Sequence, residues 1–274
     1  MIGPVVDADR WRARPPVGTV LADVRWYLDG RSGREAYERG HLPGAVFVDV
    51  DRYLAAPGSP EGGRHPLPPP EVFAEGMAAA GIGDADAVIA YDDLGGVVAA
   101  RLVWMLRVTG HEAALLDGGL AVHDPRHDGP LSTGVVARPR ATFTPRPWPA
   151  EAIVDLGEVL AGGLVLLDAR DGARYRGETE PVDPRAGHVP GALSVPCREN
   201  LDPDGRLLPV DRLRARFAAA GVADAAGTVS YCGSGINACH NLLAMEHAGL
   251  GRGRLWPGSW SQYSNRADLP VATG

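Results

Sequence analysis

The sequence lacks the features that mark membrane proteins, secreted proteins and most nucleic-acid binders. No run of about 18 or more apolar residues occurs, so we expect no membrane-spanning helix. The first residues, MIGPVVDADRW, lack the basic segment and apolar core of a signal peptide. Positive charge is also in deficit, because 27 Lys and Arg stand against 34 Asp and Glu, a net charge of -7. Binders of nucleic acid or anionic membranes are usually basic, so we expect neither partner.

Cysteine is scarce, with three residues in a chain of 274. An odd number does not make a disulfide framework, so we expect a soluble cytoplasmic protein with reduced thiols. The segment HDPRHD at 123–128 gathers two His and two Asp. Its spacing does not match a tetrahedral metal site, so we expect no metal and no other cofactor.

The sequence repeats itself over most of its length. GHLPGA at 40–45 returns as GHVPGA at 187–192, and AAGIGDADAVIAYD at 79–92 returns as AAGVADAAGTVSYC at 219–232. Two shorter matches, LADVR with LDAR and LLDGGL with RLWPGSW, keep the same order at nearly the same offset. Such order predicts a duplicated domain.

The boundary between the copies is a proline-rich segment. ARPRATFTPRPWPA at 137–150 contains four prolines and no apolar face. Proline removes amide donors and favours extended backbone in its neighbours, which is typical of a connector. We therefore predict an N-terminal domain over 1–136, a linker over 137–150 and a C-terminal domain over 151–274.

Each copy shows the same order of structural signals. An apolar run ending in Asp is followed by the Gly-His-x-Pro-Gly-Ala turn, a short strand and a helix that stops at Gly. Another strand, a glycine-containing loop, a second helix and a final strand complete the copy. Alternating strands and helices predict an α/β fold with a helix-covered, mainly parallel sheet in each domain. Ligands of such sheets bind where a strand's carboxyl end enters a loop, which is the position of Cys232.

The loop around Cys232 differs between the copies at one key place. Alignment of YDDLGG with YCGSGI puts Asp92 at the position of Cys232. A packing cysteine would be matched by a small apolar residue, so we expect this position to be exposed in both copies. Only the second copy then carries a nucleophile.

The small residues after Cys232 favour a thiolate. Gly233 and Gly235 let the backbone curl tightly, so that successive N–H groups converge on an anion. A helix predicted to begin near Asn237 adds its positive end. Such surroundings lower a cysteine pKa from about 8.5 to roughly 3.5–7.5. Cys239, within that helix, and Cys197, at a strand end, are expected to be packing residues.

Other cysteine chemistries fit the loop less well. A cysteine phosphatase places Arg six residues after the nucleophile, and that residue is Ala238 here. No local signature of a thiol protease is present. The loop can hold one extra atom and its charge, which favours a persulfide.

Four motifs of the second half resemble the tandem-domain sulfurtransferases, rhodanese and 3-mercaptopyruvate sulfurtransferase. They are LVLLDARDGARYRGETEP at 164–181, GHVPGA at 187–192, YCGSGINAC at 231–239 and WPGSWSQYS at 256–264. The resemblance extends through the first half and implies two rhodanese-like domains, of which the first has lost its cysteine. It implies transfer of sulfur from a small anionic donor, 3-mercaptopyruvate or thiosulfate, through a Cys232 persulfide. The acceptor would be cyanide or a thiol, such as thioredoxin or a low-molecular-weight thiol.

The resemblance also assigns roles to individual residues. Cys232 is the sulfur-carrying nucleophile, and Arg174 in GARYRG holds the substrate anion. Arg185 resembles a second substrate arginine. The persulfide cradle is formed by loop amides, here those of Gly233, Ser234, Gly235, Ile236 and Asn237. Ser234, His65 and Asp51 match a set that assists proton transfer in mercaptopyruvate enzymes.

Two departures from the family pattern lie in the loop. Ile236 and Asn237 replace Val-Thr, and Asn237 is expected to cap the following helix in place of the lost hydroxyl. This change also motivates an alternative function, a non-catalytic persulfide or redox-sensing module. The neutral Gly233–Ser234 pair replaces the Arg-Lys of many thiosulfate enzymes, which favours a donor with a single carboxylate.

Overall fold

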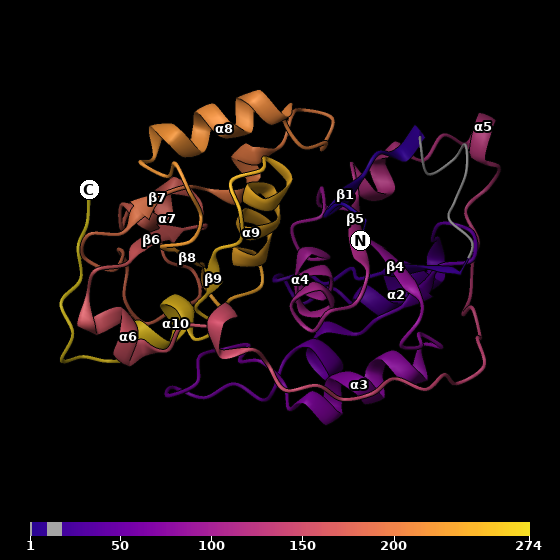
Figure 1. Ribbon diagram of the computed structural model, residues 1–274, viewed down its shortest axis with the longest axis horizontal. Helices are drawn as coiled ribbons and strands as arrows, with labels where there is room; N and C mark the ends of the chain where they lie inside the picture. The colour runs from indigo at the N-terminus through magenta and orange to yellow at the C-terminus, as the bar shows by residue number, and fades with distance from the viewer. Residues whose placement is uncertain (1, 10–17) are drawn as a thin grey trace. The chain divides into compact units, whose positions relative to one another are not determined.

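The computed structural model describes residues 2–9 and 18–274, which divide into two units (Figure 1). The N-terminal unit comprises the described residues of Met1–Ala56, Pro68–Trp148 and Asp202–Leu207. The C-terminal unit comprises Pro57–Leu67, Pro149–Leu201 and Leu208–Gly274. The segment Pro57–Leu67, which carries His65, therefore belongs to the C-terminal unit although it comes from the first half of the chain.

The N-terminal unit contains a parallel sheet of five strands in the order β1-β5-β4-β2-β3. The strands are β1 (Val5–Val6), β2 (Thr19–Asp23), β3 (Val46–Phe47), β4 (Ala87–Tyr91) and β5 (Ala113–Leu116). The described helices are α2 (Gly33–Arg39), α3 (Pro70–Ala79), α4 (Ala100–Val108) and α5 (Pro125–Asp128), with a π-helical turn η1 (Val50–Leu54) and a 3-10 turn η2 (Gly119–Val122).

The C-terminal unit repeats this plan with a parallel sheet of four strands in the order β7-β6-β8-β9. The strands are β6 (Val165–Asp168), β7 (Leu193–Ser194), β8 (Thr228–Tyr231) and β9 (Arg254–Leu255). The helices are α6 (Leu156–Ala161), α7 (Gly172–Tyr175), α8 (Val210–Ala219), α9 (Ala238–His247) and α10 (Ser259–Tyr263), with 3-10 turns η3 (Ala150–Ala152) and η4 (Cys197–Asn200). The predicted fold class, two helix-covered parallel sheets, is confirmed.

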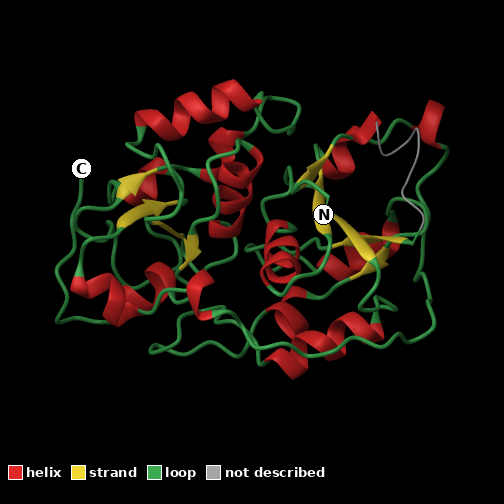
Figure 2. Ribbon diagram, viewed as in Figure 1, coloured by secondary structure: helices red, strands yellow, loops and turns green. Residues whose placement is uncertain are grey.

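Helices lie on both sides of the C-terminal sheet. Figure 2 shows α8 and α9 to one side of the four strands, and α6 and α10 to the other. Alternate strand residues point to the second side, where Leu166, Val229 and Tyr231 form a buried cluster with Trp256 and Trp260. This aromatic cluster supports the segment between β9 and α10, which contacts the Cys232 loop.

The repeated Gly-His-x-Pro-Gly-Ala motif forms the same turn in both units. The amide of Ala192 donates to the carbonyl of Val189 at 3.0 Å, and Gly191 has φ +81. The N-terminal counterpart has a Gly44 φ of +80. A type II turn needs positive φ at its third residue, which explains the Pro-Gly pair. The turn directs the chain into β3 and β7.

The segment predicted as a linker packs along the N-terminal unit. The amide of Ala141 donates to the Ala78 carbonyl at 3.1 Å, and the amide of Thr144 donates to Asp84 at 2.8 Å. The ring nitrogen of Trp148 donates to the Pro68 carbonyl at 2.7 Å. The prolines favour an extended segment, and the amides of Ala141 and Thr144 find partners on the unit. The exact domain bounds stay a prediction.

The helices of residues 2–9 and 18–274 are short. None of them has the length and apolar character that crossing a bilayer would require.

Candidate active site

Cys232 lies directly after β8, at the carboxyl end of a central strand of its sheet. The amide of Gly235 points at the Cys232 sulfur at 3.1 Å, and the amide of Ser234 does so at 3.4 Å. The loop thus turns two N–H donors toward one sulfur atom, as the glycine-rich sequence predicts. Both N–H groups are placed to donate to a negative charge on this sulfur.

The expectation that this position is exposed in both copies is wrong. Cys232 is 3% exposed and Asp92 is fully buried. Backbone amides take the place of water around the Asp92 carboxylate. Its four donors are the amides of Leu94, Gly96, Val98 and Ala99, at 2.7 to 2.8 Å. The loop is therefore a buried anion cradle and not a solvent-facing turn.

The N-terminal copy shows how strongly this loop can hold an anion. Each carboxylate oxygen of Asp92 accepts two N–H groups. Burial raises the pKa of Asp92, while the four amide hydrogen bonds act to lower it. Because every contact is a donor, no neighbour is left to accept a carboxyl proton, and the ionised form fits the cradle. The loop at Cys232 is of the same type, with amide N–H groups directed at the side chain.

Gly235 is required at its position by both conformation and space. Its φ is +80, and a Cβ atom there would lie 2.8 Å from the carbonyl oxygen of Pro257. Any larger residue would have to displace this backbone. The close approach brings the Cys232 loop against the segment that precedes α10.

Asn237 does not cap α9 as expected. It occupies the N-cap position with helical dihedrals, φ -66 and ψ -23, and its side chain makes no capping hydrogen bond. A capping side chain needs extended backbone dihedrals to reach back to the helix amides. Asn237 does not have these dihedrals, so its side chain does not cap the helix. The helix still begins at Ala238 and directs its N-terminal end toward the loop.

Ser259 supports the cysteine from the other side of the loop. Its hydroxyl accepts the N–H of Cys232 at 3.2 Å and donates to the Trp256 carbonyl at 2.8 Å. Ser259 has φ +54, the positive value that its N-terminal counterpart Gly119 also adopts. Positive φ is strained for a serine, and such strain is common at functional sites. Gly119 has no side-chain oxygen. Only Ser259, in the C-terminal copy, provides a side-chain acceptor at this position, and it does so with a strained backbone.

His65 and Ser234 form a buried pair in the C-terminal unit. The Nδ1 atom of His65 lies 2.8 Å from the Ser234 hydroxyl oxygen. Asp51 lies in η1 of the N-terminal unit, where its carboxylate accepts the Trp26 ring N–H at 2.9 Å. Burial raises the pKa of Asp51. The Ser234–His65 contact exists in the structure, and the third member of the set stays a prediction.

Arg174 lies in α7 and is held by two acidic residues. Its guanidinium contacts Glu180 at 2.6 Å and Asp183 at 3.1 Å. It also lines a cavity of about 390 Å³ together with Asp171 and Thr179. The same guanidinium would lie 3.5 Å from a Cβ atom on Gly233, so Arg174 reaches the Cys232 loop.

Arg185 has a different set of partners. Its guanidinium donates to four backbone carbonyls at 2.7 to 2.9 Å. The acceptors are Tyr263, Ser264, Arg266 and Leu269. A guanidinium has five N–H donors, so one remains for a substrate. These contacts fix the C-terminal segment, and a substrate-binding role for Arg185 stays untested.

Comparison with known proteins places this geometry in a family. The Rhodanese-like domain family matches residues 9–122 and again 153–266. The chain belongs to the rhodanese family. It has the tandem arrangement of the sulfurtransferases, and the predicted family and enzyme class, a sulfurtransferase, are confirmed.

Relatives and a solved structure align over nearly the full chain. A protein of Pseudomonas aeruginosa named "Probable 3-mercaptopyruvate sulfurtransferase" is 41% identical over 93% of this chain and 92% of its own. "Thiosulfate/3-mercaptopyruvate sulfurtransferase 1, mitochondrial" of Arabidopsis thaliana is 30% identical over 98% of this chain and 78% of its own. The crystal structure of SseA from Escherichia coli is 33% identical, with a TM-score of 0.81 over 94% of this chain and 99% of that chain.

Arg64 is a residue of this rhodanese site that sequence reasoning missed. It donates from its backbone amide to the Ser261 hydroxyl at 2.9 Å and pairs with Asp183 at 2.7 Å. Its Nη2 atom would lie 3.0 Å from a Cβ atom on Gly233. The available signal was its place directly before His65, in the segment GGRHPLP.

The other two cysteines of the rhodanese unit are buried. The Cys239 thiol lies 3.4 Å from the Gly235 carbonyl, on the inner side of the loop. Burial raises the pKa of Cys197 to about 12, so this thiol stays protonated at neutral pH. Both observations suit the packing roles expected from the sequence.

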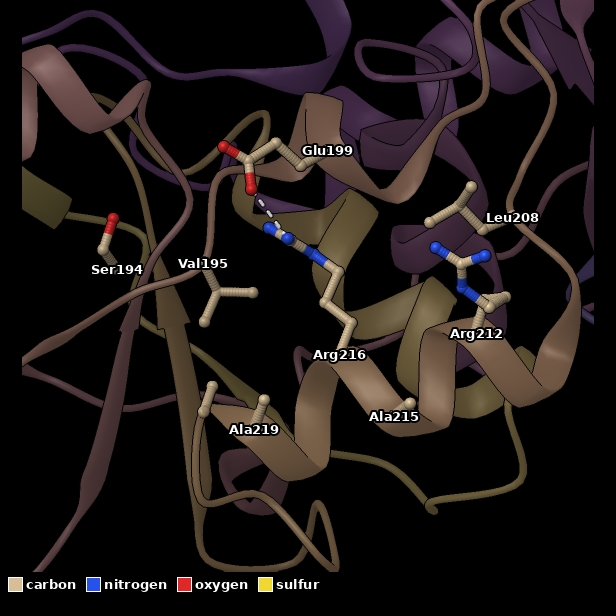
Figure 3. A pocket seen from close by; sticks show the side chains of 9 residues that line it. Ser194, Val195, Glu199, Leu208, Arg212, Ala215, Arg216 and Ala219 are labelled. Carbon is tan, nitrogen blue, oxygen red and sulfur yellow. Dashed lines mark hydrogen bonds and ion pairs between the residues drawn. The ribbon is translucent and has the colours of Figure 1, made fainter.

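A second pocket lies apart from the cysteine loop, between α8 and the segment that follows β7 (Figure 3). Its volume is about 690 Å³. Arg216 pairs with Glu199 across it at 2.7 Å. Within residues 2–9 and 18–274, no group of three or more His, Cys, Asp or Glu side chains could hold a metal ion.

Proposed function

We propose that the protein moves a sulfur atom from 3-mercaptopyruvate or thiosulfate, through a persulfide on Cys232, to a thiol or cyanide. The observation that carries this proposal is the buried amide cradle around the Cys232 sulfur. Its N-terminal counterpart accommodates a full carboxylate. Names of the relatives, which cite both donors, add support.

With 3-mercaptopyruvate, the Cys232 thiolate attacks the donor sulfur. The carbon–sulfur bond breaks, and its electron pair goes to the carbon. That carbon takes up the proton of the donor thiol and leaves as the methyl group of pyruvate, while the enzyme keeps a persulfide anion. The step needs one proton transfer from sulfur to carbon. The Ser234–His65 pair, joined at 2.8 Å, is suited to carry it.

With thiosulfate, the same thiolate attacks the outer sulfur. The sulfur–sulfur bond breaks and its electron pair leaves with sulfite, so no proton moves. The persulfide anion on Cys232 then remains among the amides of Ser234 and Gly235. Preorganised donors of this kind stabilise charge that develops during the reaction.

The acceptor completes the cycle. A thiolate or cyanide attacks the outer persulfide sulfur, and the electron pair of the broken bond returns to Cys232. The products are an acceptor persulfide or thiocyanate and the free enzyme. An odd number of cysteines, three in all, is consistent with a reducing compartment. We therefore keep the cytoplasm as the expected location and thioredoxin or a small thiol as the natural acceptor.

Arg174 is assigned to the anionic group of the donor. Its guanidinium reaches the Gly233 side of the loop and lines an adjoining cavity. The Gly233–Ser234 pair next to Cys232 carries no charge, so the loop residues by themselves favour a donor with one carboxylate.

Initial-rate kinetics test the proposal. Variation of mercaptopyruvate at several fixed cyanide concentrations should give parallel double-reciprocal lines, because the sulfur is held covalently between the two half-reactions. The variant Cys232→Ser should show no turnover. Retained turnover in that variant would refute the proposal. A persulfide that forms on Cys232 without turnover would instead indicate a persulfide-sensing module.

A further inference from the structure

One buried carboxylate holds two guanidinium groups side by side. Asp183, whose side chain is 3% exposed, contacts Arg64 with Oδ1 at 2.7 Å and Arg174 with Oδ2 at 3.1 Å. The two arginines are far apart in sequence, but both belong to the C-terminal unit. Because each takes a different oxygen, their positions are fixed together.

The two guanidiniums direct unused donors at the Cys232 loop. A Cβ atom on Gly233 would lie 3.0 Å from Nη2 of Arg64 and 3.5 Å from Nη1 of Arg174. Among the contacts of the described residues, Arg64 uses Nη1 for Asp183, and Arg174 uses Nε and Nη2 for its acidic partners. The nitrogens closest to Gly233 are therefore those left for a ligand.

Arg64 also carries a buried donor that the folded protein does not satisfy. Its Nε atom is inaccessible and has no hydrogen-bond partner. A buried unpaired donor is costly, and such groups in native structures often mark a missing ligand or water. At Arg64 the unpaired donor belongs to the same guanidinium whose Nη2 atom would lie 3.0 Å from a Cβ atom on Gly233.

The surrounding charges restrict what this pair can bind. Three guanidiniums, of Arg64, Arg170 and Arg174, face three carboxylates, of Asp168, Glu180 and Asp183. The cluster is thus balanced before a donor arrives. A bound anion would be held by the free N–H groups, and each guanidinium attracts a dianion twice as strongly as a monoanion at the same distance.

We propose that Arg64 is a second anion-binding residue of the site and admits dianionic donors, such as thiosulfate, to a loop that is itself neutral. The sulfonate end of thiosulfate has three oxygens and can bridge Arg64 and Arg174, whereas a carboxylate has two oxygens and can be held by Arg174 alone. The chain contains no lysine, so arginine supplies all of its permanently charged basic side chains. This assignment rests on the proposed function for its substrate, but the anion site can be measured without turnover.

Kinetics with both donors test the specificity. In Arg64→Gln, kcat/KM for thiosulfate should fall by about 30-fold or more, the loss of a charge-assisted contact. The fall for 3-mercaptopyruvate should be about fivefold or less, because it offers half the charge. The matched control is Arg252→Gln, which removes an exposed arginine paired with Glu246 and should keep both values. An equal fall for both donors, or none, would overturn the proposal.

Binding of sulfate separates this inference from the proposed function. By calorimetry, sulfate should bind the wild-type protein at least about tenfold more tightly than acetate, and Arg64→Gln should lose that preference. If Arg64→Gln does not fold, the sulfate-to-acetate ratio of the wild-type protein decides, and equal affinities overturn the proposal. If sulfate binds through Arg64 but neither donor forms a persulfide, the anion site stands and the proposed function fails.

Discussion

The hydroxyl of Ser259 accepts the backbone N–H of Cys232 at 3.2 Å, although Ser259 must adopt φ +54 to do so. The equivalent residue of the N-terminal unit is Gly119, which takes the same φ without strain. The C-terminal copy therefore tolerates an unfavourable backbone conformation and gains a hydrogen-bond acceptor for the Cys232 N–H.

Two substitutions separate the strain from the hydrogen bond. Ser259→Ala keeps the strain and leaves the buried Cys232 N–H unpaired, which should lower the free energy of unfolding by about 1–3 kcal/mol. Ser259→Gly loses the same acceptor but relieves about 1–2 kcal/mol of strain, so it should be the more stable of the two. Urea denaturation of both variants measures the difference. Equal stabilities would show that the positive φ carries no cost.

The Ser234–His65 pair should matter for one donor more than the other. Mercaptopyruvate needs a proton moved from sulfur to carbon, whereas thiosulfate needs none. Ser234→Ala should therefore lower kcat with mercaptopyruvate by about 10²-fold or more, the usual range for loss of general acid–base assistance. With thiosulfate the same variant should keep kcat within about tenfold of the wild-type value. Equal losses for both donors would assign the pair a structural role.

Alkylation should distinguish Cys232 from Cys197. With a pKa of about 12, Cys197 stays a thiol at pH 8. Iodoacetamide reacts with thiolates, and the pKa of a free cysteine is about 8.5. Treatment at about pH 8 should therefore modify Cys232 before Cys197 and abolish turnover. Peptide mass spectrometry locates the adduct. Modification of Cys197 before Cys232 would contradict the proposed role of Cys232 as the nucleophile.

The same shift of Cys197 has a consequence for stability. Its pKa is raised from 9.0 to about 12, so the folded state favours the thiol. Its contribution to stability is present below about pH 9 and is lost as the pH rises from there toward 12. Cys197→Ser should weaken this loss in thermal melts between those pH values.

Arg185 offers two roles with opposite consequences. Its contacts with four backbone carbonyls predict that Arg185→Gln lowers the melting temperature, because these carbonyls, three of them in part-buried hydrogen bonds, lose donors. The folded variant should keep its KM for mercaptopyruvate within about threefold, a change below 1 kcal/mol. A rise in KM of about tenfold or more with an unchanged melting temperature would support the family-implied substrate role.

The sequence predicts the duplication because the repeated motifs keep the same order and nearly the same offset along the chain. The comparison of Asp92 with Cys232 predicts the nucleophile for the same reason, and that assignment stays a prediction. Burial at this position was not predictable, because four amides that converge on Asp92 leave no mark on residue type. A charged residue normally indicates exposure, but the four amide donors allow the Asp92 carboxylate to be fully buried.

The arginines show a different limit of sequence reasoning. Arg64 meets Asp183, 119 residues away, and no periodicity connects them. Arg185 finds its carbonyls 78 to 84 residues away, and a backbone acceptor has no sequence signature at all. Motif matching selected Arg174, which lies near the Cys232 loop. It could not show how many N–H donors Arg64, Arg174 and Arg185 each have left for a substrate.

Intact mass measurement tests the central claim most directly. After treatment with 3-mercaptopyruvate or thiosulfate and removal of excess donor, the wild-type chain should gain about 32 Da, the mass of one sulfur atom. Cyanide should remove that mass and release thiocyanate. Cys232→Ser should gain nothing under the same conditions, whereas Cys239→Ser should gain the sulfur as the wild-type chain does. An unmodified wild-type chain, or the same adduct on Cys232→Ser, would contradict sulfur transfer through Cys232.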